Sequence, residues 1–226
     1  MAHSPIHSPA GILVCFAVPE EAAPFRPLRP PHADILVTGM GATNARQAFT
    51  TYLDHSPTPP SAVLTCGFAG GLHPDLPRST VLHEVDPSFP DTPVLLAAGS
   101  RPARFHCATR VAITPAEKAD LRRITQADAV EMESGVLREL CQKRGIPSAT
   151  VRVISDAAGD TLPVDFNALM SADMRLDFRK LATHLILHPT AIPGLLRLRR
   201  HTLDAARQLT SVLHRFFSHG ATGAGA

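Results

Sequence analysis

The stretch Thr-Val-Arg-Val-Ile-Ser-Asp-Ala-Ala-Gly-Asp at residues 150–160 decides the fold. Its first part, Thr150–Ile154, is mostly β-branched and apolar, which is typical of a strand covered on both faces. This strand ends at Asp156, and open α/β sheets bind ligands at the carboxyl ends of their strands. A second acidic run, Asp-Ala-Val-Glu-Met-Glu, precedes it at residues 128–133. Together the two runs predict a site that transfers protons and binds hydroxyl groups.

Strand-like and helix-like segments alternate outward from this stretch. Apolar runs predict strands at residues 11–18, 33–38, 61–66, 81–85, 94–98, 104–113 and 149–154, and helices are predicted from Pro19, over 43–54, from Pro115, over 134–144 and over 193–217. The alternation predicts one α/β domain at residues 11–217 with a largely parallel, covered sheet. We expect residues 1–10 to be a flexible leader and residues 218–226 a flexible tail.

The composition is that of an ordinary globular protein. The 226 residues are 44% hydrophobic and 19% charged, and the net charge of +2 gives no reason to expect a nucleic-acid partner. No apolar run reaches transmembrane length and the first residues lack the features of a signal peptide, so we expect a cytoplasmic location. The four cysteines lack C-x-x-C spacing and the histidines lack metal-binding motifs, which predicts reduced thiols and no metal site.

The C-terminal segment 193–217 has the pattern of a long amphipathic helix. Its apolar residues recur at helical spacing and its arginines fall on or near the other side; they are Leu195, Leu196, Leu203, Ala206, Leu209, Leu213 and Phe216, against Arg197, Arg199, Arg200 and Arg207. Two interpretations stay open. The helix packs on the sheet with solvated arginines, or it is a basic helix that touches a membrane surface or an acidic partner.

Two of the motifs also carry a family resemblance. Val-Glu-Met-Glu at 130–133, followed by Arg-Val-Ile-Ser-Asp at 152–156, resembles the signature of the nucleoside phosphorylase and nucleosidase family, which includes methylthioadenosine/S-adenosylhomocysteine nucleosidases. Gly-Phe-Ala-Gly-Gly-Leu at 67–72 matches a glycine turn of that family, and Thr-Gly-Met-Gly at 38–41 resembles a second one. The resemblance covers roughly residues 11–160.

This resemblance implies a three-layer, phosphorylase/hydrolase-like fold with a mixed, largely parallel central sheet flanked by helices. The implied activity is cleavage of the N-glycosidic bond of a purine nucleoside, with water or inorganic phosphate as co-substrate and without a metal or organic cofactor. Members of the family commonly pair, so we expect a homodimer. One departure is a deletion, because Pro27 to His32 spans a gap where relatives carry an extra strand pair.

The resemblance further implies roles for individual residues. Asp156 would protonate the base at N7, Glu133 would hold the ribose hydroxyls, and Met132 would pack on the sugar. Proton donation requires an Asp156 carboxyl group that burial keeps protonated or that is hydrogen-bonded. A carboxylate at Glu133 would accept charge-assisted hydrogen bonds and stabilise the developing oxocarbenium ion. Further candidates for substrate contact, by motif or by position, are Glu131, Gly67, Phe68, Ala69, Gly70, Val111 and Ser155.

The nucleophile distinguishes the two branches of the family. Phosphorylases typically carry Gly and Arg after the first strand, because phosphate needs backbone donors and a cation. This chain has Pro19-Glu20-Glu21 there, and Glu21 matches the glutamate that activates water in nucleosidases. Phe68 stands where many relatives have Ser or Thr, which also favours water over phosphate. In the other interpretation, Glu20 and Glu21 only stabilise the helix N-terminus through its dipole.

The region after residue 160 resembles one subgroup of this family. Thr161-Leu162-Pro163 and the Leu/Arg pattern at 192–198 look most like the hopanoid-associated subgroup, whose members are usually called phosphorylases and are thought to release adenine from adenosylhopane. The candidate substrates are therefore 5'-substituted adenosines such as methylthioadenosine or adenosylhopane. The alternative is a catalytically impaired nucleoside-binding protein of the same fold, suggested by the deletion at 27–32 and by Phe68.

Overall fold

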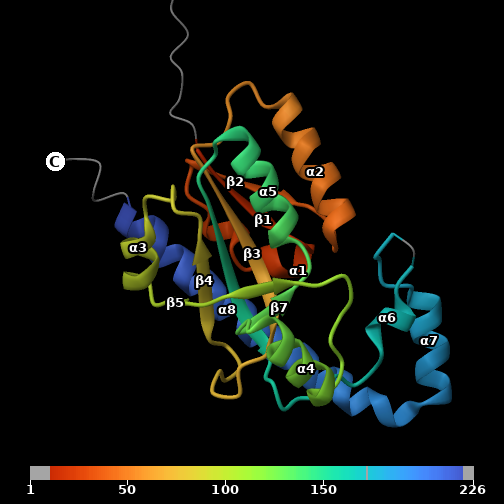
Figure 1. Cartoon of the computed structure of the whole chain (residues 1–226). Helices are drawn as coiled ribbons and strands as arrows, with labels where there is room; N and C mark the ends of the chain where they lie inside the picture. The colour runs from red at the N-terminus through yellow and green to blue at the C-terminus, as the bar shows by residue number, and fades with distance from the viewer. Residues whose placement is uncertain (1–10, 172, 221–226) are drawn as a thin grey trace, which may run out of the picture.

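The computed structural model describes residues 11–171 and 173–220. Within these residues the strands form one sheet in the order β2-β1-β3-β8-β4-β5, with β7 beside β3 and β6 beside β7 (Figure 1). The strands are β1 (Ile12–Phe16), β2 (Ala33–Val37), β3 (Ala62–Gly71), β4 (Val81–Val85), β5 (Arg101–Pro102), β6 (Phe105–Cys107), β7 (Ala129–Glu131) and β8 (Ser148–Asp156). Strands β2, β1, β3 and β8 are parallel, whereas β4 is antiparallel to β8. The predicted mixed, largely parallel sheet is confirmed.

Helices cover both faces of the sheet and complete a three-layer domain (Figure 1). They are α1 (Pro19–Ala22), η1 (Arg26–Leu28), α2 (Ala42–His55), α3 (Thr92–Ala97), α4 (Pro115–Thr125), α5 (Ser134–Arg144), α6 (Phe166–Leu169), α7 (Phe178–Leu187), η2 (Pro189–Ala191) and α8 (Ile192–Gly220). Helices α2 and α5 pack on one face through a core that includes Phe49 and Leu137. Helices α1, α3 and α8 lie on the other face, over a core that includes Phe16, Leu64 and Val153.

Every residue of β8 is buried, including Arg152. This agrees with its largely apolar and β-branched sequence, since a central strand is covered on both sides. Its neighbour β3 is longer than predicted. The 61–66 prediction stops at the glycine motif, but the strand continues through Gly71 and pairs with β8 as far as Gly70 opposite Asp156. The predicted glycine turn is therefore a strand with a register shift between Ala69 and Gly70.

One predicted strand is wrong, and another is much shorter than predicted. Residues 94–98 fall largely in helix α3, whose first turn contains Pro93 and whose Leu95 is buried while Leu96 is half exposed. A short apolar run does not distinguish a helix from a strand, and the proline at the helix start decides here. Of residues 104–113, only Phe105–Cys107 is a strand. The rest forms a loop that leads to the Thr114 N-cap of α4.

Helix α8 begins one residue earlier and ends later than the predicted 193–217, at Gly220. Its C-terminal half packs on the sheet through Leu209 and Leu213, which confirms the docked interpretation for that half. Its N-terminal half exposes Leu196 and Leu203. Residues 218–220 of the predicted tail are helical, while 221–226 and the predicted leader 1–10 lie outside the described residues. None of the helices in the described part of the chain is long and apolar enough to cross a membrane.

Candidate active site

Most of the predicted site residues line one cavity of ≈ 210 Å³ at the carboxyl ends of the parallel strands. We call it the acidic cavity. Glu21 reaches it from α1, the strand β3 contributes one wall, the segment after β7 another, and the end of β8 a third. The predicted residues that line it are Glu21, Phe68, Ala69, Gly70, Val111, Glu131, Met132, Glu133, Ser155 and Asp156. Glu21 and Asp156, which are 135 positions apart in the sequence, thus line the same small cavity.

Arg152 organises two of the carboxylates from below the cavity. Its side chain is 1% exposed, and Nη2 donates to Glu131 Oε2 at 2.6 Å and to Glu133 Oε2 at 3.1 Å. Glu131 also accepts from the backbone N–H groups of Glu133 and Ser134 and from the Ser134 hydroxyl. Burial favours the neutral acid, but the Arg152 guanidinium and the Ser134 hydrogen bonds outweigh it and lower the pKa of Glu131. Both Glu131 oxygens are engaged within the protein, so this residue orients its neighbours.

Glu133 has a different environment. Its Oε1 accepts from the Gly41 N–H at 2.8 Å, so the second glycine motif contacts the acidic run directly. Burial raises the pKa of Glu133, with Arg152 acting in the opposite direction and the Glu131 charge adding to the rise. A carboxylate oxygen has two lone pairs. With one protein donor recorded on each oxygen, Glu133 retains acceptor capacity toward the cavity.

Glu21 is buried beside the same guanidinium. Its Oε2 accepts from Ala17 N–H at 2.9 Å and Val18 N–H at 3.2 Å, and its Oε1 accepts from Phe68 N–H at 2.8 Å. Burial is the largest effect and raises the pKa of Glu21 to about 7, although Arg152 and the Phe68 hydrogen bond favour the carboxylate. A carboxyl group with a pKa near neutrality is suited to general-base catalysis.

Gly67 supports the cavity from behind and does not line it. Its φ is +145°, and a Cβ atom there would lie 2.6 Å from both Glu21 Oε1 and Arg152 Nη1. Only glycine therefore allows the carboxylate and the guanidinium to approach this strand so closely. The structure gives Gly67 a packing role, whereas the sequence predicted substrate contact.

A buried lysine, which the sequence analysis did not identify, holds Asp156. Lys118 of α4 is fully buried, and its Nζ lies 2.5 Å from Asp156 Oδ2. The same ammonium donates to the carbonyl oxygens of Ala157 and Asp160, while the Ser155 hydroxyl donates to Asp156 Oδ1 at 2.7 Å. Asp156 is hydrogen-bonded as predicted, and its partner on Oδ2 is a buried ammonium group.

Asn167 is a second residue that sequence reasoning missed. Val111 N–H donates to Asn167 Oδ1 at 2.9 Å, and Asn167 Nδ2 donates to Val111 C=O at 3.0 Å. This paired contact ties the loop before α4 to helix α6. Val111 thus lines the cavity with its backbone hydrogen-bonding groups already paired.

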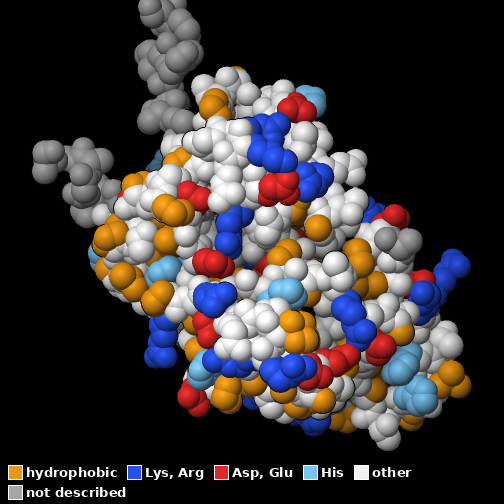
Figure 2. All heavy atoms as spheres, in the orientation of Figure 1, with side chains coloured by type: hydrophobic (Ala, Val, Ile, Leu, Met, Phe, Trp, Pro, Cys, Tyr) orange, Lys and Arg blue, Asp and Glu red, His pale blue; other side chains and the backbone are white. Residues whose placement is uncertain are grey.

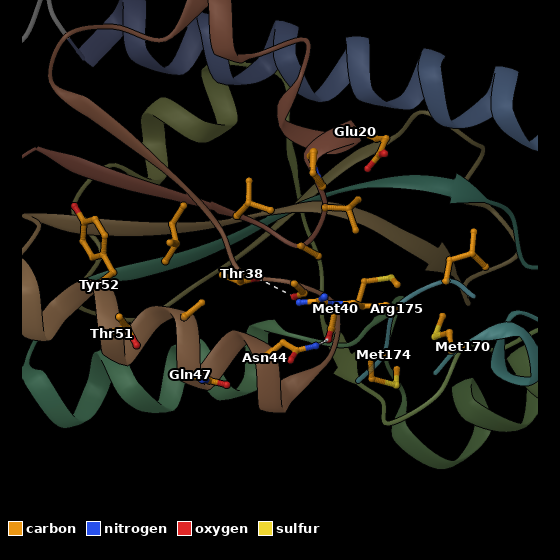
Figure 3. A pocket seen from close by; sticks show the side chains of 18 of the residues that line it. Glu20, Thr38, Met40, Asn44, Gln47, Thr51, Tyr52, Met170, Met174 and Arg175 are labelled. Atoms are coloured by element: carbon orange, nitrogen blue, oxygen red, sulfur yellow. Dashed lines mark hydrogen bonds between the residues drawn. The ribbon is translucent and has the colours of Figure 1, made fainter. Parts of the chain in front are cut away.

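A larger groove of ≈ 1480 Å³ lies next to the acidic cavity. The two spaces share Ala17, Val18 and Met40 in their walls. Figure 3 shows Asn44, Gln47, Thr51 and Tyr52 following α2 along this groove, with Met170 and Met174 near its other end. Because its wall also includes Leu36, Phe166 and Phe178, we call it the apolar groove.

Comparisons with known proteins agree with this geometry. The family model described as phosphorylase superfamily matches residues 104–187, which contain both acidic motifs. Over these residues the chain is similar to this superfamily. A 5'-methylthioadenosine/S-adenosylhomocysteine nucleosidase of Geobacillus kaustophilus is 28% identical over 172 residues, covering 61% of this chain and 72% of the relative. The corresponding protein of Oceanobacillus iheyensis is 25% identical over 169 residues, covering 60% and 73%.

Solved structures share this fold. Futalosine hydrolase of Helicobacter pylori superimposes with a TM-score of 0.67 at 16% identity, over 93% of this chain and 98% of that one. The 5'-methylthioadenosine/S-adenosylhomocysteine nucleosidase of Neisseria meningitidis, in complex with methylthio-immucillin-A, gives 0.67 at 14% identity, over 92% and 99%. The family resemblance and the three-layer α/β fold predicted from the sequence are confirmed.

Proposed function

We propose that this protein is a nucleosidase that hydrolyses the N-glycosidic bond of a purine nucleoside. The observation that carries the proposal is the acidic cavity itself, in which Glu21, Glu133 and Asp156 face one small space from three different environments. Departure of a purine needs a proton for the base, negative charge near the sugar and a base for water. Each carboxylate suits one of these tasks.

Glu133 is the proposed ribose ligand. Its carboxylate is fixed by Gly41 and Arg152 and retains lone pairs that two vicinal hydroxyls can reach. Because it is buried, its charge acts on the developing oxocarbenium ion with little screening by solvent. Met132 lines the same wall and would pack on the sugar. Glu131 acts on the substrate only through Arg152 and the backbone it holds.

The Lys118–Asp156 pair is the proposed proton source for the base. As the bond between the sugar and the purine breaks, its electron pair moves to the purine, and the pair delivers the proton shared along its 2.5 Å hydrogen bond. Lys118 is then neutral and Asp156 remains ionised. The pair is reprotonated from solvent after the base leaves. Ser155 fixes the second oxygen of Asp156 during the transfer.

Glu21 is the proposed general base. Water attacks the anomeric carbon, forms the new C–O bond and gives one proton to Glu21, which then returns it to solvent. Phosphate fits this cavity poorly, because its negative charges would meet three acidic groups. The cations at the cavity are already paired. Arg152 Nη2 is engaged by Glu131 and Glu133, Lys118 pairs with Asp156, and Arg110 pairs with Glu117. Hydrolysis is therefore favoured over phosphorolysis.

The 5'-substituent is the finer part of the proposal. The named nucleosidase relatives support a 5'-substituted adenosine, with methylthioadenosine as the smallest candidate and adenosylhopane as the candidate suggested by the sequence after residue 160. No feature of the cavity favours the alternative, a catalytically impaired nucleoside-binding protein of the same fold. The acids expected to act in catalysis lie together, and Phe68 is part of the wall around them. The homodimer and the cytoplasmic location stay predictions.

One assay tests the activity and the nucleophile together. The purified chain is incubated with methylthioadenosine in buffers with and without inorganic phosphate, and the sugar product is identified by mass spectrometry. We expect adenine and free methylthioribose in both buffers, and Asp156→Asn to be inactive. Detection of a sugar 1-phosphate would show that the chain catalyses phosphorolysis and not hydrolysis. Tight nucleoside binding with no adenine released over hours would contradict the nucleosidase function and support the binding-protein alternative.

A further inference from the structure

Asp156 lies between two separate spaces. On one side it lines the acidic cavity, and on the other it lines a pocket of ≈ 250 Å³, which we call the rear pocket. Among the described residues, Asp156 alone belongs to both walls. The polar residues of the rear pocket come from the loop before β4, from the segment after β8 and from α8; besides Asp156 they are Arg78, Asp160, Thr161, Arg197 and His201.

Helix α4 covers the Lys118–Asp156 pair on a third side. Figure 2 shows basic and acidic side chains together over the lower part of the molecule, where α4 lies in Figure 1. Asp120 and Arg123 of this helix pair with each other in solvent, whereas Lys118 points inward and is fully buried. The side chain of Lys118 is 0% exposed and that of Asp156 is 12% exposed. Solvent therefore reaches the pair at Asp156, from the acidic cavity or from the rear pocket.

The rear pocket is suited to a chain of water molecules. A water molecule occupies about 30 Å³ in the liquid and needs two to four polar partners in a protein, so a pocket of ≈ 250 Å³ has room for several. Arg78 and Arg197 in its wall are both exposed, which opens the pocket to the surface. Arg78 Nε also donates to Asp160 Oδ2 at 2.7 Å and so fixes the wall beside Asp156.

Among the titratable and charged side chains of this wall, His201 is the one suited to pass protons. The others are Arg78, Asp156, Asp160 and Arg197. Arginine stays protonated in proteins. Burial favours the neutral acid at Asp160, but the Arg78 hydrogen bond outweighs it and lowers the pKa of Asp160, so this residue stays a carboxylate. His201 is half-buried on α8, and an imidazole ring can accept a proton at one nitrogen and release one from the other.

The proposed reaction moves two protons in opposite directions. The Lys118–Asp156 pair gives one proton to the base, and Glu21 takes one from the attacking water. Glu21 lines the acidic cavity and not the rear pocket. A purine in front of Asp156 blocks the recovery of the pair through the acidic cavity, whereas the rear pocket stays open to solvent.

We propose that the rear pocket is the path by which the Lys118–Asp156 pair regains its proton, and that His201 relays this proton from solvent. This rests on the proposed function. His201 accepts a proton from solvent at one ring nitrogen and releases one from the other to water in the pocket. The water chain passes a proton to Asp156, which transfers it to the neutral Lys118. The pair is again an ammonium and a carboxylate, and His201 is again neutral.

Steady-state and acid-quench kinetics test the relay. Recovery of the pair follows bond cleavage, which is irreversible in hydrolysis, so its rate contributes to kcat and not to kcat/KM. His201→Phe and His201→Gln should each lower kcat for methylthioadenosine at least about tenfold, while kcat/KM changes less than about twofold. Both variants should release a burst of adenine equal to the enzyme concentration before the slow steady state. Free imidazole in the buffer should restore kcat.

The matched control is His214→Phe, which replaces an exposed histidine of the same helix and should keep the wild-type kcat without a burst. Wild-type kcat in both His201 variants overturns the proposal. A loss in His201→Phe but not in His201→Gln does so too, because the imidazole is then not needed. An equal loss of kcat and kcat/KM would show that His201 only supports the shape of the site.

A second measurement does not depend on turnover. Exchange of the Lys118 ammonium protons with solvent is followed by NMR while adenine occupies the acidic cavity. We expect exchange to continue in the wild type and to slow several-fold in His201→Phe. If this holds but no nucleoside is cleaved, the nucleosidase function fails while the rear path stands. If adenine stops the exchange in the wild type, protons reach the pair through the acidic cavity and the proposed path is wrong.

Discussion

The ion pair of Lys118 and Asp156 is the residue-scale feature with the sharpest consequence. A fully buried ammonium 2.5 Å from the carboxylate is held there at a cost in desolvation, and removing one partner leaves an unpaired buried charge. We expect Lys118→Met to lower kcat about 10²-fold or more by removing the proton source, and to destabilise the fold by about 3–5 kcal/mol. Steady-state kinetics on the folded fraction and urea unfolding measure the two effects.

A double variant controls for the loss of stability. Lys118→Met with Asp156→Asn removes both charges, so it should be more stable than Lys118→Met alone while staying inactive. If Lys118→Met keeps wild-type kcat, Asp156 delivers the proton without the lysine, and the pair has only a structural role.

The second residue-scale prediction concerns the pH dependence of Glu21. Burial raises its pKa to about 7, so it is mostly protonated below neutral pH and cannot accept a proton from water. As pH falls below about 7, kcat/KM should therefore decrease tenfold per pH unit, and above 7 this limb should be flat. Glu21→Gln should remove most of the activity. The residual activity should no longer decrease below about pH 7. An acidic limb that persists unchanged in Glu21→Gln belongs to another group.

The sequence identified the acids of this site but not what holds them. Glu21, Glu133 and Asp156 stand in motifs that a family resemblance can match. Lys118 lies on an amphipathic helix where a lone lysine is normally solvated, and Asn167 is a lone amide in the mostly apolar stretch 164–170. The local sequence pattern does not indicate that either side chain is directed toward the cavity. That orientation results from the packing of α4 and α6 beside the cavity.

At the scale of elements, Asn167 is one of the side chains that hold the loop between β6 and α4. Asn167 pairs with both backbone groups of Val111, and through them α6 holds one wall of the acidic cavity. Asn167→Ala should raise KM for the nucleoside several-fold with a smaller effect on kcat, because the wall loosens while the acids stay in place. Thr183→Ala on exposed α7 is the control. Equal kinetics in Asn167→Ala and wild type would show that the loop is held by its other contacts.

Gly67 allows Glu21 and Arg152 to pack closely against strand β3. A Cβ atom at Gly67 would lie 2.6 Å from Glu21 Oε1 and from Arg152 Nη1, at a φ of +145°. Gly67→Ala should therefore destabilise the fold by about 1–3 kcal/mol, the usual range for overpacking or a strained backbone, and lower activity by displacing both side chains. Gly159→Ala is the matched control, since nothing lies within 4 Å of a Cβ there. Urea unfolding with equal midpoints for both variants would contradict this role.

The element predictions failed where tertiary contacts override a local pattern. Residues 94–98 are as apolar as a strand, yet Pro93 and the one-sided burial of Leu95 make them helical. Residues 104–113 stop pairing after Cys107 because the chain leaves the sheet to form the loop of the site. The central strands were predictable because burial on both faces leaves an unbroken apolar run.

At the scale of the whole molecule, the net charge of +2 conceals an uneven distribution. Residues 178–203 carry five basic residues and no acidic ones, whereas the remainder of the chain has 17 basic residues against 20 acidic ones. A neutral nucleoside is bound by hydrogen bonds and packing, so its binding does not depend on these exposed charges.

This separation predicts that catalysis responds little to salt. The Debye length falls from about 10 Å at 0.1 M to about 3 Å at 1 M ionic strength, which screens exposed charges far more than buried ones. Raising the salt concentration over this range should change kcat/KM for methylthioadenosine less than about twofold, because the Arg152 and Lys118 ion pairs are buried. Adenine release measured at each salt concentration checks this. A large fall in kcat/KM with salt would mean that exposed charges take part in binding the nucleoside.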